Sequence, residues 1–141
     1  MHKKYQYDGL MFDSSIEIAY YIYMKDHKTE ILRANTSFPY EFNGNIWHYI
    51  PDFYLPQLDQ YVEIKGDHFF KEDGTMHIPW KGKQNDEKYR FSCEKAKAKH
   101  QCMIRNNIKI IKQSDIEMKN ALQYINSKYG KKYLKQFKSS K

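Results

Sequence analysis

Residues 46–65 have the sequence IWHYIPDFYLPQLDQYVEIK. The first ten and the last six of these residues are runs rich in aromatic and β-branched side chains, separated by a turn at 57–59, and such runs are typical of neighbouring strands. A similar run over 37–42 precedes Asn43-Gly44. Asn-Gly between two such runs is the strongest short-range signal for a β-hairpin. The sequence therefore predicts a meander of three strands.

A helix is predicted before this meander, starting from Ser14 as the N-cap. Glu17 follows three residues later, which is the spacing of a capping box. The helical pattern ends near residues 26–27. Apolar residues at helical spacing mark one face of this helix: Ile16, Ala19, Tyr20 and Tyr23.

Three further elements are predicted after the meander. A long, charged helix is expected over 84–105, a short buried strand over 108–111, and a last helix capped by Ser114. Residues 67–83 have the composition of an inserted functional loop. The passage from helix to strand at 84–111 requires a crossover, so the order α-β-β-β-α-β-α predicts a mixed α/β sheet flanked by helices. The inward-facing residues are expected to be Phe91, Ala98, Cys102, Ala121, Leu122 and Ile125.

Composition limits the classes of protein that fit. The chain has 141 residues, enough for one ordinary domain. It carries 24 Lys and Arg against 17 Asp and Glu, a net charge of +7, which favours a polyanionic partner such as nucleic acid or an anionic membrane surface. No apolar run approaches the ~18–20 residues that span a bilayer, so a transmembrane protein is excluded.

The cysteine and histidine pattern indicates a reducing compartment and no zinc site. Two cysteines cannot form a disulfide framework, and the N-terminus lacks the apolar region of a secretory signal, so a cytoplasmic protein is expected. The spacing of zinc ligands is missing from the candidate residues His68, His77, Cys93, His100 and Cys102.

Two carboxylates and an ammonium are predicted to converge on the last two strands of the meander. Side chains alternate along a strand, so Glu63 and Lys65 share one face. The turn near Leu58 places Asp52 opposite Glu63 or Ile64. Asp52, Glu63 and the carbonyl of Ile64 are therefore candidate ligands for Mg²⁺, with Mn²⁺ as a substitute. Lys65 could orient water or stabilise negative charge on a phosphate.

Each of these residues also has a purely structural interpretation. Asp52, Glu63 and Lys65 could form a cross-strand salt bridge on a solvated face. Their position on two strands joined by a tight turn, in a basic chain, favours the functional interpretation. Glu17 could serve only to complete a capping box with Ser14, which stabilises a helix by about 0.5–2 kcal/mol.

Pro51-Asp52 followed by Glu63-Ile64-Lys65 resembles the signature of the PD-(D/E)xK nuclease superfamily, and the predicted order of elements resembles its common core. Residues 12–17, FDSSIE, resemble the first-helix motif of a subset of that superfamily. The subset includes phage Holliday-junction-resolving endonucleases, transposon-end endonucleases and very-short-patch repair-like nucleases. The helix glutamate of the subset belongs to the active site. The resemblance therefore implies Glu17, Asp52, Glu63 and Lys65 as catalytic residues.

The resemblance implies a Mg²⁺-dependent endonuclease, a hydrolase acting on DNA, with selectivity for branched DNA and a phage-type origin in the host cytoplasm. It covers about residues 10–112, and a C-terminal helix and basic tail at 113–141 complete a single domain. One site cuts one strand, so paired cuts would require a homodimer. Three alternatives stay open: a sequence-specific restriction or homing endonuclease, a non-catalytic nucleic-acid-binding module on the same fold, and a structural partner in a larger complex.

Five lysines are predicted to contact the nucleic-acid backbone. Contacts to phosphate position a protein on nucleic acid, and basic side chains on a helix beside the site suit this role. The alternative is a solvated helix face whose lysines pair with Glu87 and Glu94. The five candidates are Lys88, Lys95 and Lys99 on the predicted long helix, and Lys131 and Lys132 in the tail.

Overall fold

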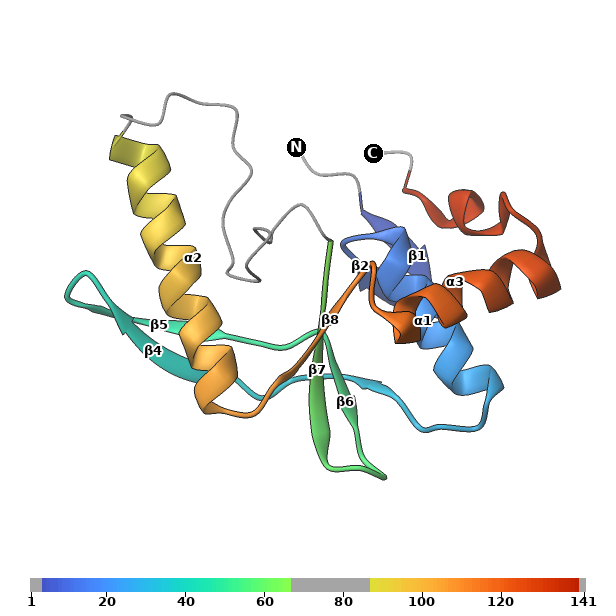
Figure 1. The fold of residues 1–141 in the computed structure, drawn as a ribbon, viewed down its shortest axis with the longest axis horizontal. Coiled ribbons are helices and arrows are strands. Elements are labelled where there is room, and N and C mark those ends of the chain that lie inside the picture. The colour runs from blue at the N-terminus through green and yellow to red at the C-terminus, as the bar shows by residue number, and fades with distance from the viewer. Residues whose placement is uncertain (1–3, 67–86, 140–141) are drawn as a thin grey trace.

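A mixed four-stranded sheet lies at the centre of the computed structural model (Figure 1). Its strands are β3 (Leu32–Arg33), β6 (Phe53–Leu55), β7 (Gln60–Lys65) and β8 (Lys109–Lys112), in the order β3-β6-β7-β8. β6 is antiparallel to β3 and β7, whereas β8 is parallel to β7. The predicted mixed α/β class is thus confirmed. The structure describes residues 4–66 and 87–139, so the predicted insertion at 67–83 and the predicted helix start at 84–86 lie outside the described residues.

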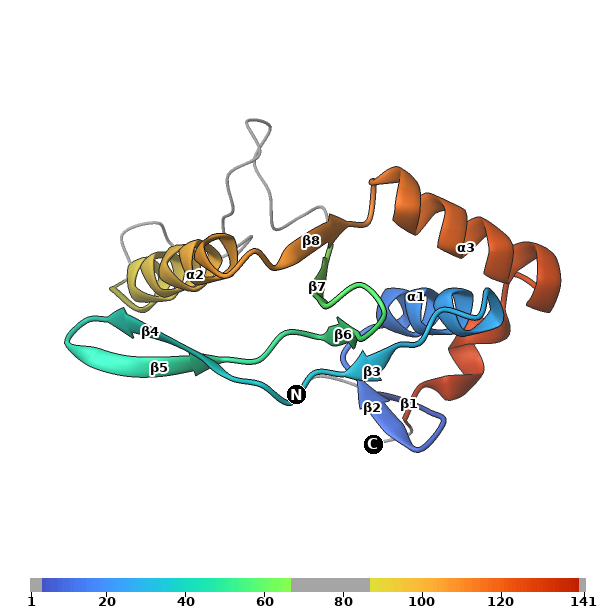
Figure 2. The ribbon, with the colours of Figure 1, turned by 90° about the horizontal axis from the view of Figure 1, so that it is seen from below.

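A hairpin and a helix form an arm to one side of this sheet (Figures 1 and 2). β4 (Phe38–Phe42) and β5 (Asn45–Tyr49) pair around Asn43-Gly44, as predicted. Asn43 and Gly44 have φ angles of 53° and 78°, the positive values that a tight two-residue hairpin turn requires. α2 (Glu87–Arg105) packs on β4 and is the predicted long helix.

The inner side of α2 is only partly as predicted. Cys102 and Met103 are fully buried in a cluster with Tyr40 and Tyr49. Phe91 was expected to face inward, but 41% of it is exposed. Its ring centroid lies 5.1 Å from that of Phe42, near the end of the hairpin. The arm therefore has its dense packing close to the central sheet.

The prediction of one continuous strand over 46–55 is wrong. This stretch forms β5 and β6, which belong to separate sheets, so the three predicted strands do not make one meander. Residues 50–52 interrupt the pairing. Pro51 has no N–H to donate and restricts the conformation of Ile50. As a result Asp52 lies in the break, directly before β6.

Two helices cover the other face of the sheet and pack side by side (Figure 2). α1 (Ser15–Asp26) has Ser14 as its N-cap, as predicted, and α3 (Ile116–Tyr129) follows β8. The N-cap of α3 is Asp115 and not the predicted Ser114; the Asp115 carboxylate does not cap the helix but accepts the N–H of Lys112 at 2.8 Å. No helix in the described ranges is long and apolar enough to cross a bilayer. The shared core includes Ile18, Ile22, Phe53, Val62, Ile111 and Ile125.

Segments near the two ends of the chain form a layer that the sequence did not reveal. β1 (Tyr5–Tyr7) and β2 (Leu10–Phe12) form an N-terminal hairpin, and a 3-10 helix, η2 (Tyr133–Phe137), packs against it. The N–H of Ser139 donates to the carbonyl of Lys4 at 2.7 Å. The segment predicted to be a basic tail is therefore folded onto the N-terminal hairpin as far as residue 139.

Candidate active site

The four predicted catalytic residues line one pocket, where β7 ends and α1 begins. The pocket has a volume of about 480 Å³. Glu17 comes from the first turn of α1, Asp52 from the break before β6, and Glu63 and Lys65 from β7. The lining also includes Ser14, Ile64 and Gln113. Segments far apart in the sequence thus bring three carboxylates and an ammonium to one cavity.

Asp52 and Ile64 meet across the β6–β7 pair, as the predicted register requires. Phe53 pairs with Val62, so Asp52 lies across from Glu63 and Ile64. The Asp52 Oδ2 atom accepts the N–H of Ile64 at 2.8 Å. The N–H and C=O of one strand residue point to the same side, so the Ile64 carbonyl faces the Asp52 side of β7. The Lys65 carbonyl points to β8 and accepts the N–H of Gln113 at 3.0 Å.

Glu63 has a protein donor on each of its carboxylate oxygens. The Tyr49 hydroxyl donates to Oε1 at 2.6 Å, and the Lys65 Nζ atom lies 3.3 Å from Oε2. Glu63 is 5% exposed, and the Lys65 side chain is 16% exposed. A buried carboxylate is costly unless it is paired and hydrogen-bonded, and Glu63 satisfies both conditions. These two contacts therefore hold the carboxylate in a fixed position.

Glu17 is buried in the first turn of α1. Ser14 caps this helix by accepting the backbone N–H of Glu17. The Ser14 hydroxyl accepts the backbone N–H of Glu17 at 3.4 Å and donates to Glu17 Oε2 at 3.0 Å. An Arg33 guanidinium nitrogen lies 3.5 Å from Oε1. The cap can thus persist when the carboxylate charge is removed, so the two interpretations of Glu17 can be separated by experiment.

Burial and neighbouring carboxyls raise the proton affinity of Asp52 and Glu17. Burial raises the pKa of Asp52 well above its ordinary value, and the charges of Glu63 and Glu17 raise it further. The Ile64 N–H and Arg33 act in the opposite direction. Burial also raises the pKa of Glu17, against the Ser14 hydrogen bond and Arg33. Such perturbed carboxyls in a pocket are typical of sites that hold a cation or transfer a proton.

The substitution Asp52→Asn is expected to stabilise the metal-free protein at neutral pH. The folded-state pKa of Asp52 lies above its ordinary value of 3.8, so the folded chain binds this proton more tightly than the unfolded chain. Tighter proton binding by Asp52 adds to the free energy of unfolding. This contribution is fully present below pH 3.8 and is lost as the pH rises through the folded-state pKa. An uncharged amide avoids this loss.

Urea unfolding in EDTA, at pH 4 and pH 7, measures this effect. At pH 7 the free energy of unfolding of the Asp52→Asn variant should exceed that of the wild type by about 0.5–2 kcal/mol, and the excess should be smaller at pH 4. A variant less stable than the wild type at pH 7 would contradict the assigned burial of the Asp52 charge.

Two residues of the site were not found from the sequence. Arg33 lies against the rings of Phe12 and Phe53, with its guanidinium carbon 4.9 and 5.2 Å from the ring centroids. It belongs to a two-residue strand, which is too short to show a periodic pattern. Tyr49 is one of 13 tyrosines, and nothing in the sequence around it marks it as a partner of Glu63.

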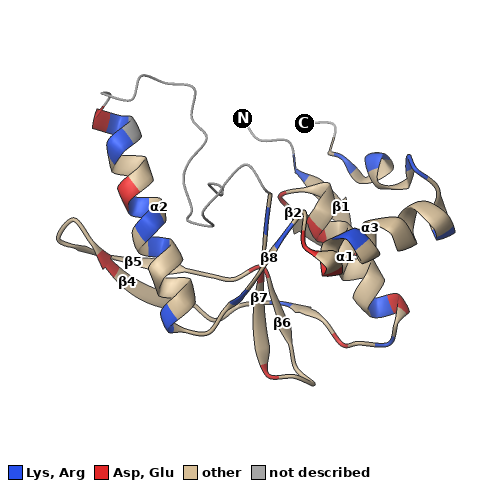
Figure 3. Cartoon of the chain, viewed as in Figure 1, with Lys and Arg blue, Asp and Glu red and all other residues tan. Residues whose placement is uncertain are grey.

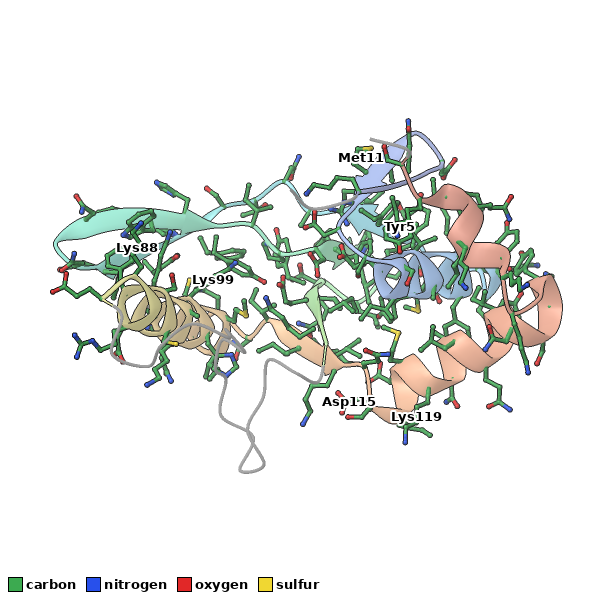
Figure 4. All side chains as sticks on the ribbon, turned by 90° about the horizontal axis from the view of Figure 1, so that it is seen from above. Tyr5, Met11, Lys88, Lys99, Asp115 and Lys119 are labelled. Carbon is green, nitrogen blue, oxygen red and sulfur yellow. The ribbon has the colours of Figure 1, made fainter. Side chains whose placement is uncertain are left out.

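The five predicted nucleic-acid contacts fall into two separate groups. Lys88 is exposed at the outer end of α2, whereas Lys99 lies closer to the centre of the molecule (Figure 4). Lys95 and Lys99 share the face of α2 that lies against β5. Figure 3 shows that the basic residues of α2 and those after α3 lie at opposite ends of the molecule, and Lys131 and Lys132 are exposed there. The two groups therefore cannot form one compact patch.

The ring contacts of two of these lysines define their position. The Lys95 Nζ atom lies 3.4 Å from the ring centroid of Trp47, and the Lys99 Nζ atom lies 5.4 Å from that of Tyr49. Burial lowers the pKa of Lys99, and the charge of Lys65 lowers it further. The charges of Glu63 and Asp52 raise the pKa of Lys99 and so oppose these two effects. Lys99 therefore lies within electrostatic reach of the pocket.

The donor set available for a metal ion combines side chains and backbone. Within residues 4–66 and 87–139, no group of three or more His, Cys, Asp or Glu side chains is arranged to hold a metal ion. The predicted set has two carboxylates, Asp52 and Glu63, and the backbone carbonyl of Ile64. Comparison with protein-family models, with curated proteins and with solved structures gives no match.

Proposed function

We propose that this protein is a Mg²⁺-dependent endonuclease with a PD-(D/E)xK nuclease-like core, which hydrolyses DNA phosphodiester bonds. The observation that carries the proposal is the meeting of Asp52, Glu63 and Lys65 in one pocket, with the Ile64 carbonyl on the Asp52 side of β7. A net charge of +7 supports a polyanionic substrate.

The donors of the pocket fit a hard divalent cation. Asp52, Glu63 and the Ile64 carbonyl offer only oxygen atoms, which Mg²⁺ prefers. Burial and the charges of Glu63 and Glu17 raise the pKa of Asp52, and a divalent cation bound there would favour its ionised form. When bound, Mg²⁺ would contribute Lewis-acid polarisation of the phosphodiester.

The side chains of the pocket have distinct roles in this proposal. The Lys65 ammonium, held 3.3 Å from Glu63, would stabilise the negative charge that develops on the phosphate oxygens. Glu17, whose pKa is raised by burial, would accept a proton from the attacking water. Arg33 would restrain the Glu17 carboxylate through its contact at 3.5 Å.

The substitution Glu17→Gln separates catalysis from helix capping. The Ser14 hydroxyl still accepts the backbone N–H at position 17, so the thermal midpoint should change little. The cleavage rate should fall at least ~10²-fold, because a proton acceptor is lost. Single-turnover cleavage and thermal unfolding on the same preparation measure both effects. Glu30→Gln, an exposed acid beyond α1, is the control. A Glu17→Gln variant with the wild-type rate would restrict Glu17 to its structural role.

Cleavage of a substrate panel tests the proposed function. The panel contains linear duplex, single-stranded, nicked, mismatched and four-way-junction DNA, and RNA, each with Mg²⁺ or with EDTA. We expect cleavage of DNA in Mg²⁺ only, with branched DNA cut faster than linear duplex. Binding without cleavage of any substrate, in Mg²⁺ or Mn²⁺, would overturn the proposal and favour a non-catalytic binding module.

A further inference from the structure

One buried hydrogen bond joins the arm to the candidate catalytic carboxylate. Tyr49 is the last residue of β5, and Glu63 lies in β7 of the central sheet. The Tyr49 hydroxyl lies 2.6 Å from Glu63 Oε1, within the short range of hydrogen bonds to ionised acceptors. Tyr49 is 2% exposed and Glu63 is 5% exposed, so water has little access to either partner.

Tyr49 is built to act as a fixed donor. Its ring is packed in the cluster formed by Tyr40, Cys102, Met103 and Ile108, and the Lys99 ammonium lies 5.4 Å from its centroid. The packed ring holds the hydroxyl at Glu63 Oε1, to which it donates at 2.6 Å.

The same short segment also carries Asp52. Residues 49–52 leave β5 and lead into β6, with Pro51 limiting their conformational freedom. Tyr49 contacts Glu63 at one end of this segment, and Asp52 contacts the Ile64 N–H at the other. The break that interrupts the predicted strand thus fixes both carboxylates relative to one another.

Resting on the proposed function, we infer that Tyr49 is a positioning residue, whose hydroxyl orients Glu63 for a divalent cation. Lys65 holds Oε2 and Tyr49 holds Oε1. An ionised carboxylate has about four lone-pair sites, so each oxygen keeps capacity for a cation beside its donor. Hydrogen-bond partners of metal ligands commonly set affinity in this way.

Tyr49→Phe removes only the hydroxyl and leaves the packed ring. Titration of the full chain with Mn²⁺, without DNA and followed by electron paramagnetic resonance, measures affinity independently of activity. We expect the Kd for Mn²⁺ to rise ~10–100-fold, the usual effect of losing such a partner. The thermal midpoint in EDTA reports whether the variant is folded. Tyr40→Phe, a change to another buried tyrosine of the same cluster, should leave the Kd unchanged.

The outcomes separate this inference from the proposed function. Equal Mn²⁺ affinity of wild type and Tyr49→Phe would overturn the role of Tyr49, even if the wild type cleaves DNA. Equal weakening by Tyr40→Phe and Tyr49→Phe would also overturn it, because general loosening of the cluster would then explain the loss. Selective weakening by Tyr49→Phe in a protein that cleaves no substrate would support the inference while overturning the nuclease proposal.

Discussion

The variants Asp52→Asn and Glu63→Gln are expected to lose Mg²⁺-dependent cleavage by at least ~10³-fold while they remain folded. Both substitutions keep the size of the side chain and remove its charge. The amide introduced by Asp52→Asn can still accept the Ile64 N–H, which lies 2.8 Å from the carboxylate in the wild type. Loss of activity would therefore report the lost charge and not a broken β6–β7 contact.

Single-turnover cleavage with saturating enzyme measures this loss. The matched control is Asp59→Asn on the β6–β7 turn, where the aspartate is exposed and accepts the Tyr54 hydroxyl at 2.6 Å. An amide oxygen can accept the same hydrogen bond, so the control should cleave at the wild-type rate. Wild-type cleavage by either pocket variant, with Mg²⁺ as the only metal, would exclude its residue from the active site.

The substitution Lys65→Met is expected to lower the cleavage rate ~10²–10³-fold with a smaller effect on DNA binding. Methionine keeps most of the apolar stem and removes the ammonium, which lies 3.3 Å from Glu63 Oε2. The proposed role of Lys65 concerns charge that develops only in the transition state, so kcat should fall more than affinity does. The Tyr49 hydroxyl still holds Glu63 in this variant.

Cleavage rates and DNA affinity, measured on one preparation, separate the two effects. Lys109→Met is the matched control, because Lys109 lies on the neighbouring strand β8 and forms an exposed ion pair with Glu117 at 2.9 Å. This control loses an ion-paired lysine outside the pocket and should keep the wild-type rate. A Lys65→Met variant that loses affinity but keeps its single-turnover rate would show that Lys65 binds substrate without assisting the reaction.

The candidate site could be predicted because local rules determine its residues. Strand alternation gave the shared face of Glu63 and Lys65, and the length of the turn gave the register that brings Asp52 to Ile64. The serine three residues before Glu17 likewise located the start of α1. Each rule connects residues through one strand, one turn or one helix end. The place of Glu17 beside the strand residues came instead from the resemblance to the nuclease superfamily.

The arrangement of the sheets could not be predicted, because tertiary contacts decide it. The run 46–55 is rich in strand-forming residues on both sides of Pro51, and its two parts belong to different sheets. β3 has only two residues, too few for a strand pattern in the sequence. It is a strand only because it pairs with β6. Arg33 on β3 and Tyr49 at the end of β5 reach the site only through this arrangement.

The packing of the C-terminal segment also could not be predicted from its sequence. Its lysines predicted a basic tail that contacts nucleic acid, whereas its aromatic residues pack it on the N-terminal hairpin. The Phe137 ring packs 4.8 Å from that of Tyr7, and Tyr129 stacks on Tyr133 with centroids 4.4 Å apart. The segment is rich in lysine, but the partly buried rings of Tyr129, Tyr133 and Phe137 hold it in place.

The pocket is proposed to hydrolyse phosphodiester bonds with the help of a divalent cation. The decisive experiment compares cleavage of a labelled four-way DNA junction by the wild type and by Asp52→Asn, each with Mg²⁺ and with EDTA. Cleavage products are expected only for the wild type in Mg²⁺. Products of equal amount from both proteins, or from the wild type in EDTA, would rule out this function of the pocket.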